Sequence, residues 1–274
     1  MRHKKVKNLD SRLAAVQDYL VTDIGGSALK VKETAAKYKG NWREYFASLQ
    51  ETAEPAASIG QATSTGQAAS TGQAAPAGLS NPVESEIQHS TPIADTDSRR
   101  LYLELGCGKG KFINARALDD PDAYFVGIEG LDAVLVRGLE RAKEARIANL
   151  RFVSAYVADI RDFFADGELD GIYLNFSDPW PKPRHEKRRF TYGDTLLKYR
   201  QILKPGGFVA FKTDNEDLFT FTLEEIERLG LTIEEMSRDL HSPDCTLAAR
   251  RFTTEYEDKF SGKGKNINYV KIRF

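Results

Sequence analysis

The chain has 274 residues, of which 41% are hydrophobic and 29% are charged, and its formal net charge is -1. Such a composition can form a packed core, and any attraction to nucleic acid must come from a local basic patch. No apolar run approaches the roughly 18 residues of a membrane helix, and the basic start lacks the apolar segment of a signal peptide. Two isolated cysteines, Cys107 and Cys245, exclude a disulfide framework and a cysteine-rich zinc site. We expect a metal-free cytoplasmic protein, and the sequence does not decide between a monomer and a homodimer.

Composition divides the chain into three zones. Residues 1–49 form a basic N-terminal arm, with an amphipathic stretch near 13–20 and an aromatic lead-in at 38–42. Residues 50–97 are low in complexity, and one Ser-Thr-Gly-Gln-Ala-Ala unit directly follows another. Because this zone has few large apolar residues to offset its chain entropy, we expect a disordered insert that displaces the arm from the core. Residues 98–274 carry the patterned domain.

Strand-like and helix-like runs alternate in this domain. We expect helices from about 111 and at 131–147, 193–203 and 216–229, and strands at 101–105, 124–128, 150–153, 171–176, 208–212, 233–236 and 267–272. The Lys-Pro-Gly-Gly run at 204–207 is typical of a helix stop. Alternating strands and helices predict an open, mostly parallel seven-stranded α/β sheet with helices on both faces. Ligands then belong at the carboxyl ends of the strands.

A glycine-rich turn follows the first expected strand and opens the next helix. Gly106, Gly108 and Gly110 allow a tight turn and close approach of a ligand to the backbone. Their spacing is tighter than the dinucleotide fingerprint, and Glu129 stands at the end of the second strand, where a ribose hydroxyl is bound. This pattern alone leaves NAD and S-adenosylmethionine open. Glu104 favours the cationic S-adenosylmethionine, because a carboxylate beside the glycines would repel a pyrophosphate, although it is also consistent with a solvated strand end.

The segment 175–190 combines a carboxylate, an aromatic side chain and a basic run. An apolar run ends near Asp178, and three prolines around Trp180 stiffen the loop and stop the sheet. The cations that follow are Lys182, Arg184, Lys187, Arg188 and Arg189. These are the parts needed to hold a nucleobase on its RNA. A tryptophan such as Trp180 is more often a packing lid than a base-stacking surface. A charge run is usually a solvated face, but its position beside the expected site favours contact with RNA.

These motifs resemble the bacterial tRNA (guanine-N7-)-methyltransferase family. The resemblance covers about 99–274 plus the short lead-in at 38–42. Within 99–274 it is carried by residues 104–110, 178–189, 212–215 and 254–260. It implies a Rossmann-like methyltransferase fold for residues 98–274. It also implies transfer of a methyl group from S-adenosylmethionine to N7 of guanine 46 in the tRNA variable loop.

The resemblance implies roles for individual residues as well. Asp178 would be the catalytic acidic residue. The cofactor would be bound by Glu104, Gly106, Gly108 and Glu129, with Asp159, shifted from the family's usual position, as the adenine contact. The substrate would be contacted by Lys182, Asp214, Thr254, Glu255, Tyr256 and Glu257, and the RNA by Arg184, Lys187, Arg188 and Arg189. From the residues alone, 254–257 is only a polar loop before the last strand.

Guanine N7 carries a lone pair and no proton, so its attack on a sulfonium methyl group needs no general base. Catalysis would depend on positioning and electrostatics. Asp178 would accept the N1–H and 2-amino group of guanine and favour the charge that develops on the ring, and Asp214 would share this role. N7 faces the major groove, which is deep and narrow in A-form RNA, so the target belongs in a loop.

Three alternatives are open. A methyltransferase for small molecules or proteins is disfavoured by the basic loop. An NAD-dependent oxidoreductase is disfavoured by Glu104 and the glycine spacing. An RNA-binding protein with a vestigial cofactor pocket would lack methyl transfer to tRNA.

Overall fold

The computed structural model describes residues 6–22, 33–34, 36–51 and 97–274. The insert expected at 50–97 therefore lies outside the described residues except at its ends, and the expected domain boundaries stay predictions.

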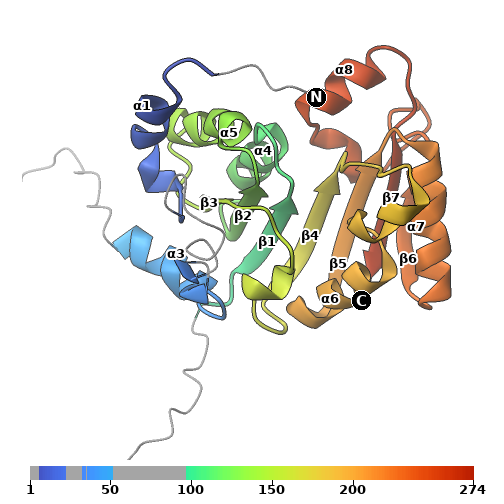
Figure 1. Cartoon of the computed structure of the whole chain (residues 1–274), viewed down its shortest axis with the longest axis horizontal. Helices are drawn as coiled ribbons and strands as arrows, with labels where there is room; N and C mark the ends of the chain where they lie inside the picture. Colours follow the sequence, from blue (N-terminus) through green and yellow to red (C-terminus); the bar gives the residue numbers. More distant parts are fainter. Residues whose placement is uncertain (1–5, 23–32, 35, 52–96) are drawn as a thin grey trace, which may run out of the picture.

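The core of the molecule is one seven-stranded sheet (Figure 1). Its strands are β1 (Arg100–Leu105), β2 (Ala123–Glu129), β3 (Leu150–Ser154), β4 (Leu169–Asn175), β5 (Leu203–Thr213), β6 (Thr232–Ser237) and β7 (Asn268–Arg273). The α-helices are α1 (Leu9–Ala14), α3 (Trp42–Glu51), α4 (Lys111–Asp119), α5 (Asp132–Glu144), α6 (Gly193–Ile202), α7 (Glu216–Arg228) and α8 (Glu255–Ser261). The strand order is β3-β2-β1-β4-β5-β7-β6, and only β7 runs antiparallel to its neighbours. The Rossmann-like, mostly parallel fold is thus confirmed.

Helices cover both faces of this sheet, because alternate residues of each strand point to opposite sides. In β1, Leu103 packs in a core that includes apolar residues of α3, α6 and α7. Its neighbour Tyr102 belongs to a second core, which includes residues of α4 and α5. The parallel strands all end at one edge, and the loops that leave this edge place the candidate site residues.

The described residues of the N-terminal arm pack against the rest of the domain. Trp42 is fully buried, and its indole N–H donates to the Phe163 carbonyl at 3.0 Å. The ring of Phe46 stacks on Tyr124, with 4.5 Å between their centroids. Leu20 forms a parallel bridge with Phe152 of β3. The expectation that the insert displaces the arm from the core is therefore wrong for the described residues, because these large apolar side chains bury against the domain.

The helix stop expected at 204–207 is confirmed, because α6 ends at Ile202. Two other local predictions need correction. The strand expected at 208–212 begins earlier, since β5 starts at Leu203 and includes the Lys-Pro-Gly-Gly run. Gly206 adopts a φ of 77°, which glycine tolerates, so the chain turns from helix into strand without a separate loop. The expected polar loop at 254–257 is the start of α8, where Thr254 and Glu257 form a capping box. Among the residues described, no helix has the length and apolar character needed to cross a bilayer.

Candidate active site

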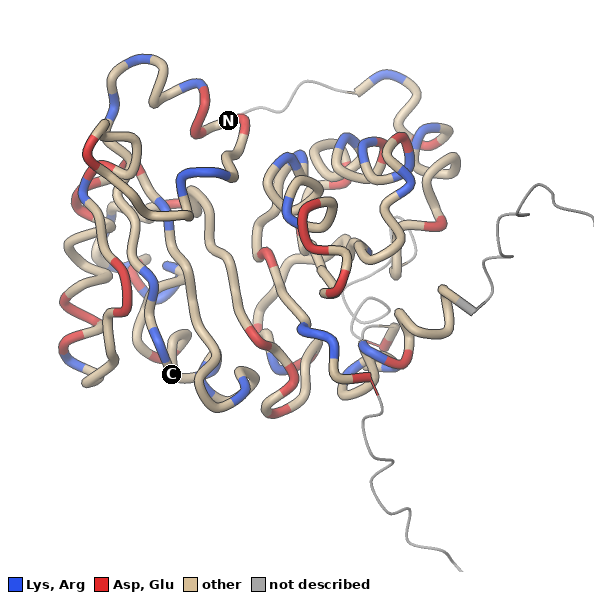
Figure 2. Tube along the Cα trace, turned by 180° about the vertical axis from the view of Figure 1, so that it is seen from behind, with Lys and Arg blue, Asp and Glu red and all other residues tan. Residues whose placement is uncertain are grey.

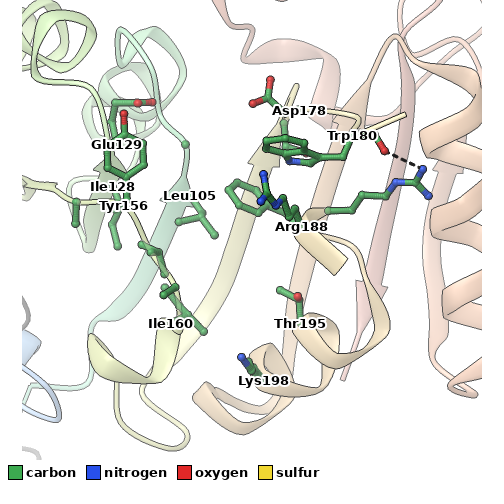
Figure 3. A pocket seen from close by; sticks show the side chains of 18 of the residues that line it. Leu105, Ile128, Glu129, Tyr156, Ile160, Asp178, Trp180, Arg188, Thr195 and Lys198 are labelled. Atoms are coloured by element: carbon green, nitrogen blue, oxygen red, sulfur yellow. Dashed lines mark hydrogen bonds between the residues drawn. The ribbon is translucent and has the colours of Figure 1, made fainter. Parts of the chain in front are cut away.

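A cavity of about 610 Å³ opens where the parallel strands end (Figure 3). Its walls come from the glycine turn after β1, the ends of β2 and β3, the loop after β4 and the start of α6. Gly106, Glu129 and Asp178, which lie far apart in the sequence, all line it. Figure 3 shows Glu129 on one side and Asp178 on the other. The size is typical of a small-molecule or cofactor site.

The glycine turn brings the backbone to the cavity wall. Gly108 has a φ of 57°, a conformation that favours glycine, and its N–H donates to Glu129 Oε2 at 3.1 Å. Gly110, with a φ of 68°, lies so close to α5 that an added Cβ would come within 2.9 Å of the Gly138 Cα. Backbone conformation and close packing therefore both require glycine in this turn.

Glu129 has room to accept more hydrogen bonds. Its Oε1 accepts from the Leu131 N–H at 3.0 Å, and its Oε2 accepts from Gly108. A carboxylate offers about four lone-pair directions, so roughly two remain for a ligand. These suit the paired hydroxyls of a ribose.

Tyr156 is a cavity residue that the sequence analysis missed. Its side chain is 77% exposed, and its ring lies beside Gly130, where an added Cβ would come within 2.5 Å. The only signal in the sequence is an aromatic residue two positions after the third strand. An exposed ring beside Glu129 offers a flat surface for a nucleobase.

Asp159, the expected adenine contact, is engaged elsewhere. Its carboxylate accepts from the backbone of Arg161 and forms ion pairs with Arg161 and Lys198. The Arg161 guanidinium holds the pKa of this carboxyl well below its usual range. Val157 and Ala158 line the cavity, whereas Asp159 does not. Its role toward adenine stays a prediction without support from this geometry.

Glu104 lies behind the glycine turn, on the opposite face of β1 from Leu105. It is 1% exposed, so the alternative of a solvated strand end is wrong. Its Oε1 accepts from Asn175 Nδ2 at 2.8 Å, and its Oε2 has no partner among the residues described. Burial raises the pKa of this carboxyl to about 8. Glu104 does not line the cavity, and its contact with the cofactor stays a prediction.

The loop after β4 presents Asp178 at the cavity. Phe176 and Trp180, two residues to either side, have φ values of 55° and 42°. A left-handed conformation is uncommon for such bulky residues and tends to occur at functional sites. The loop is held at both ends, because the Phe176 N–H donates to the Lys212 carbonyl and Arg189 donates to the carbonyls of Pro179 and Trp180.

The basic run divides into two kinds of cation. Arg189 is half-buried by these loop contacts, and its guanidinium lies 4.2 Å from the centroid of the Phe221 ring. The other four cations are exposed and have no ion pair among the residues described: Lys182, Arg184, Lys187 and Arg188. Arg188 covers Trp180 at 4.9 Å, and both line the cavity together with Lys187. The exposed cations are thus available to phosphates, whereas Arg189 shapes the loop.

The first and last residues of the 254–257 group serve to anchor α8. The Thr254 hydroxyl accepts from the Glu257 N–H at 3.0 Å. Glu257 is fully buried, and it pairs with Lys212 at 3.1 Å and with His241 at 2.8 Å. Burial lowers the pKa of Lys212. Glu257 is buried and already paired, so it is poorly placed for direct substrate contact, and the half-buried Thr254 is engaged as the cap of α8.

The middle residues of the group face outward. Glu255 pairs with Arg141 of α5. The Tyr256 hydroxyl donates to Asp214 Oδ2 at 3.3 Å, and its ring centroid lies 5.0 Å from that of Phe176. Through this contact Tyr256 and Asp214 adjoin the loop that carries Asp178, although neither lines the cavity itself.

Within the described part of the chain, no group of three or more His, Cys, Asp or Glu side chains could hold a metal ion. The expectation of a metal-free site stays a prediction.

Comparison with known proteins places this site in a family. A family model described as "Putative methyltransferase" matches residues 98–270. A tRNA (guanine-N(7)-)-methyltransferase from Halalkalibacterium halodurans is 47% identical over 174 residues, covering 64% of this chain and 78% of the relative. Relatives of the same name from Geobacillus thermodenitrificans and Latilactobacillus sakei are 45% and 43% identical, over 62% and 64% of this chain and 78% and 81% of their own lengths. The chain therefore belongs to the bacterial tRNA (guanine-N7-)-methyltransferase family, the one its motifs resemble.

Proposed function

We propose that this protein transfers the methyl group of S-adenosylmethionine to N7 of guanine 46 in the variable loop of tRNA. One observation carries the proposal: Glu129 and the glycine turn share a single cavity with Asp178, and exposed cations lie at its rim. We call the side of the cavity with Glu129 and the glycine turn the first wall, and the side with Asp178 the second wall. A cofactor on the first wall and a guanine on the second would face each other. A tRNA substrate would place the reaction in the cytoplasm.

The residues of the first wall fit the cofactor. Glu129 offers its remaining lone pairs to the ribose hydroxyls, and Tyr156 offers a ring for the adenine. Leu105 and Ile128 provide an apolar floor beside the exposed backbone of Gly106. When bound, the cofactor supplies a methyl group on a positively charged sulfur. This wall fixes the direction from which that group is presented.

The second wall suits a guanine. Asp178 is exposed, and its two oxygens can accept the N1–H and the 2-amino group of the base. This contact strengthens as the ring gains positive charge, so the carboxylate favours the transition state over the ground state. No side chain needs to remove a proton from N7.

The test is methyl transfer to an unmodified tRNA transcript with labelled cofactor, followed by nuclease mapping of the labelled nucleoside. We expect one methyl group per tRNA, as 7-methylguanosine at position 46, and none in a transcript with adenine there. Label at another base, or no label with folded wild-type protein, would overturn the proposal. An RNA-binding protein without activity would give the second result while still retaining tRNA.

A further inference from the structure

The end of α8 and the turn after it carry three lysines around one aromatic ring. The Nζ atoms of Lys259, Lys263 and Lys265 lie 5.4, 5.7 and 5.2 Å from the centroid of Phe260. All three lysines are exposed. Lys265 pairs with Asp214 at 3.0 Å, whereas Lys259 and Lys263 have no ion pair with any residue that the structure describes. Figure 2 shows basic positions, Lys or Arg, recurring along the trace at the upper left, where α8 and the turn after it lie.

A row of rings connects these lysines to the active site. The centroids of Phe260 and Tyr256 are 4.2 Å apart, and those of Tyr256 and Phe176 are 5.0 Å apart. Phe176 lines the cavity two positions before Asp178. Tyr256 is 43% exposed, so part of its surface is open to a partner. The lysines therefore lie at the far end of an aromatic strip that begins beside the proposed catalytic carboxylate.

The strip stands on a fixed support. Glu257 ties α8 to β5 through its buried pair with Lys212, and Glu255 ties it to α5 through Arg141. In Figure 1, α8 lies at the edge of the sheet where β4 and β5 end. The lysines are therefore presented from an anchored helix and the turn that follows it.

The chemistry of this strip matches a single-stranded polynucleotide. Unpaired lysines attract phosphates, and exposed rings stack on bases of any sequence. A second group of unpaired cations, in the loop 182–188, lies on the same sheet edge and lines the cavity wall at Lys187 and Arg188. Asp178 belongs to the loop between them, so a bound strand can be held on both sides of the target base.

We propose that Lys259, Lys263, Phe260 and Tyr256 form a second RNA-contact surface, which holds the nucleotides that flank the target guanine. This inference rests on the proposed function, because it takes tRNA as the substrate. It adds residues 259–263 to the tRNA-binding surface expected from the basic loop.

The test replaces the two unpaired lysines, Lys259→Ala with Lys263→Ala, and measures tRNA affinity by filter binding over a series of salt concentrations. Removing two phosphate contacts should weaken binding about tenfold at low salt and make the log–log salt slope shallower by roughly 1 to 1.5. The thermal shift with S-adenosylhomocysteine should equal that of the wild type, since the cavity is untouched.

A matched control is Lys37→Ala with Lys39→Ala, two exposed lysines just before α3, which lies across the molecule from α8 (Figure 1). It changes the net charge equally and should alter tRNA affinity less than twofold. Wild-type affinity and slope in the first variant, or an equal loss in the control, would overturn the second surface. If wild-type protein methylates tRNA in the same experiment, such a result rejects this surface alone. If it neither binds nor methylates tRNA, the proposed function fails as well.

Discussion

The two walls of the cavity differ in how far their polar groups are already hydrogen-bonded and in the backbone conformation of their residues. On the wall formed by β1 and β2, Glu129 already accepts two backbone N–H groups, and glycines allow the turn its left-handed angles at low cost. On the wall after β4, Asp178 is exposed between Phe176 and Trp180, two bulky residues in a left-handed conformation.

This difference indicates how the two ligands are bound. The first wall has most of its polar groups satisfied before anything binds, as expected of a preformed cofactor site. The second wall has a strained backbone, an exposed carboxylate and unpaired cations. A polynucleotide can engage the carboxylate with a base and the cations with its phosphates at the same time. Changes on the first wall should therefore affect cofactor affinity, and changes on the second should affect turnover and RNA affinity.

The largest effect should come from Asp178→Asn. The substitution keeps the shape but removes the charge, and it turns one acceptor toward the guanine into a donor. We expect the turnover number to fall roughly 10²- to 10³-fold, the usual range for the loss of one group that stabilises developing charge. The measurement is single-turnover methyl transfer at saturating cofactor and tRNA.

The control for this change is Asp122→Asn, an exposed carboxylate just before β2, at the opposite edge of the sheet. It should leave turnover unchanged. Near-normal turnover in Asp178→Asn, with an unaltered thermal shift by S-adenosylhomocysteine, would remove Asp178 from the mechanism.

Glu129→Gln should produce the next largest effect, and it should act on the cofactor. The amide keeps only one acceptor oxygen, so the Gly108 or Leu131 N–H loses its partner, and the ribose loses a charged acceptor. Hydrogen bonds to charged groups contribute about 1.5–3 kcal/mol, which corresponds to a rise in cofactor Kd of about 10- to 150-fold. Calorimetric titration with S-adenosylhomocysteine measures it.

Glu227→Gln, an exposed change on α7, is the matched control for this titration. The affinity for tRNA should stay within twofold of wild type in both variants. A cofactor Kd like that of the wild type in Glu129→Gln would show that ribose is bound elsewhere.

The sheet was predictable from the sequence because its signals are local. Apolar runs of strand length locate six of the seven strands to within two residues, and only β5 begins well before its expected start. The start of α8 also carried a local signal, since Thr254 and Glu257 have the spacing of a capping box, but three polar residues in a row suggested a loop. Burial of Trp42 and Phe46 could not be read, because their partners lie more than 70 residues away in the sequence.

The site was predictable where strand ends converge. Gly106 and Asp178 follow parallel strands and Glu129 ends one, and such ends meet at one edge of the sheet. The orientations of the Asp159 and Glu104 side chains were not predictable. The first turns toward Arg161 and the second toward Asn175, and neither partner is marked by any pattern.

The next prediction, with a smaller effect, separates the roles of Arg188 and Arg189 in the basic loop. Replacing both Arg188 and Arg189 with Ala is expected to weaken tRNA binding with little effect on cofactor affinity. The structure separates the two residues, because Arg188 is exposed and can bind a phosphate, whereas Arg189 donates to the carbonyls of Pro179 and Trp180. Arg188→Ala should make the salt slope of tRNA binding shallower by roughly 0.7.

Arg189→Ala should instead lower turnover about tenfold, because the loop around Asp178 loses two hydrogen bonds of about 1 kcal/mol each. Its salt slope should match the wild type. Equal decreases in slope for the two variants would mean that Arg189 also meets a phosphate and that its loop contacts open when RNA binds.

The smallest effect concerns Glu104 and is seen in stability. Its pKa is raised from 4.5 to about 8 by burial, so above about pH 4.5 the unfolded chain releases a proton that the folded protein keeps. The folded state therefore loses stability on this account as the pH rises from about 4.5 to 8.

Glu104→Gln can still accept from Asn175 and carries no charge. It should be more stable than wild type at pH 8.5 by at least about 1.4 kcal/mol, the free energy of one pKa unit. Urea unfolding at pH 5 and pH 8.5 measures the difference, which should shrink toward pH 5. Parallel pH profiles for the two proteins would show that Glu104 is ionised in the folded state, as a carboxylate beside a bound cation would be.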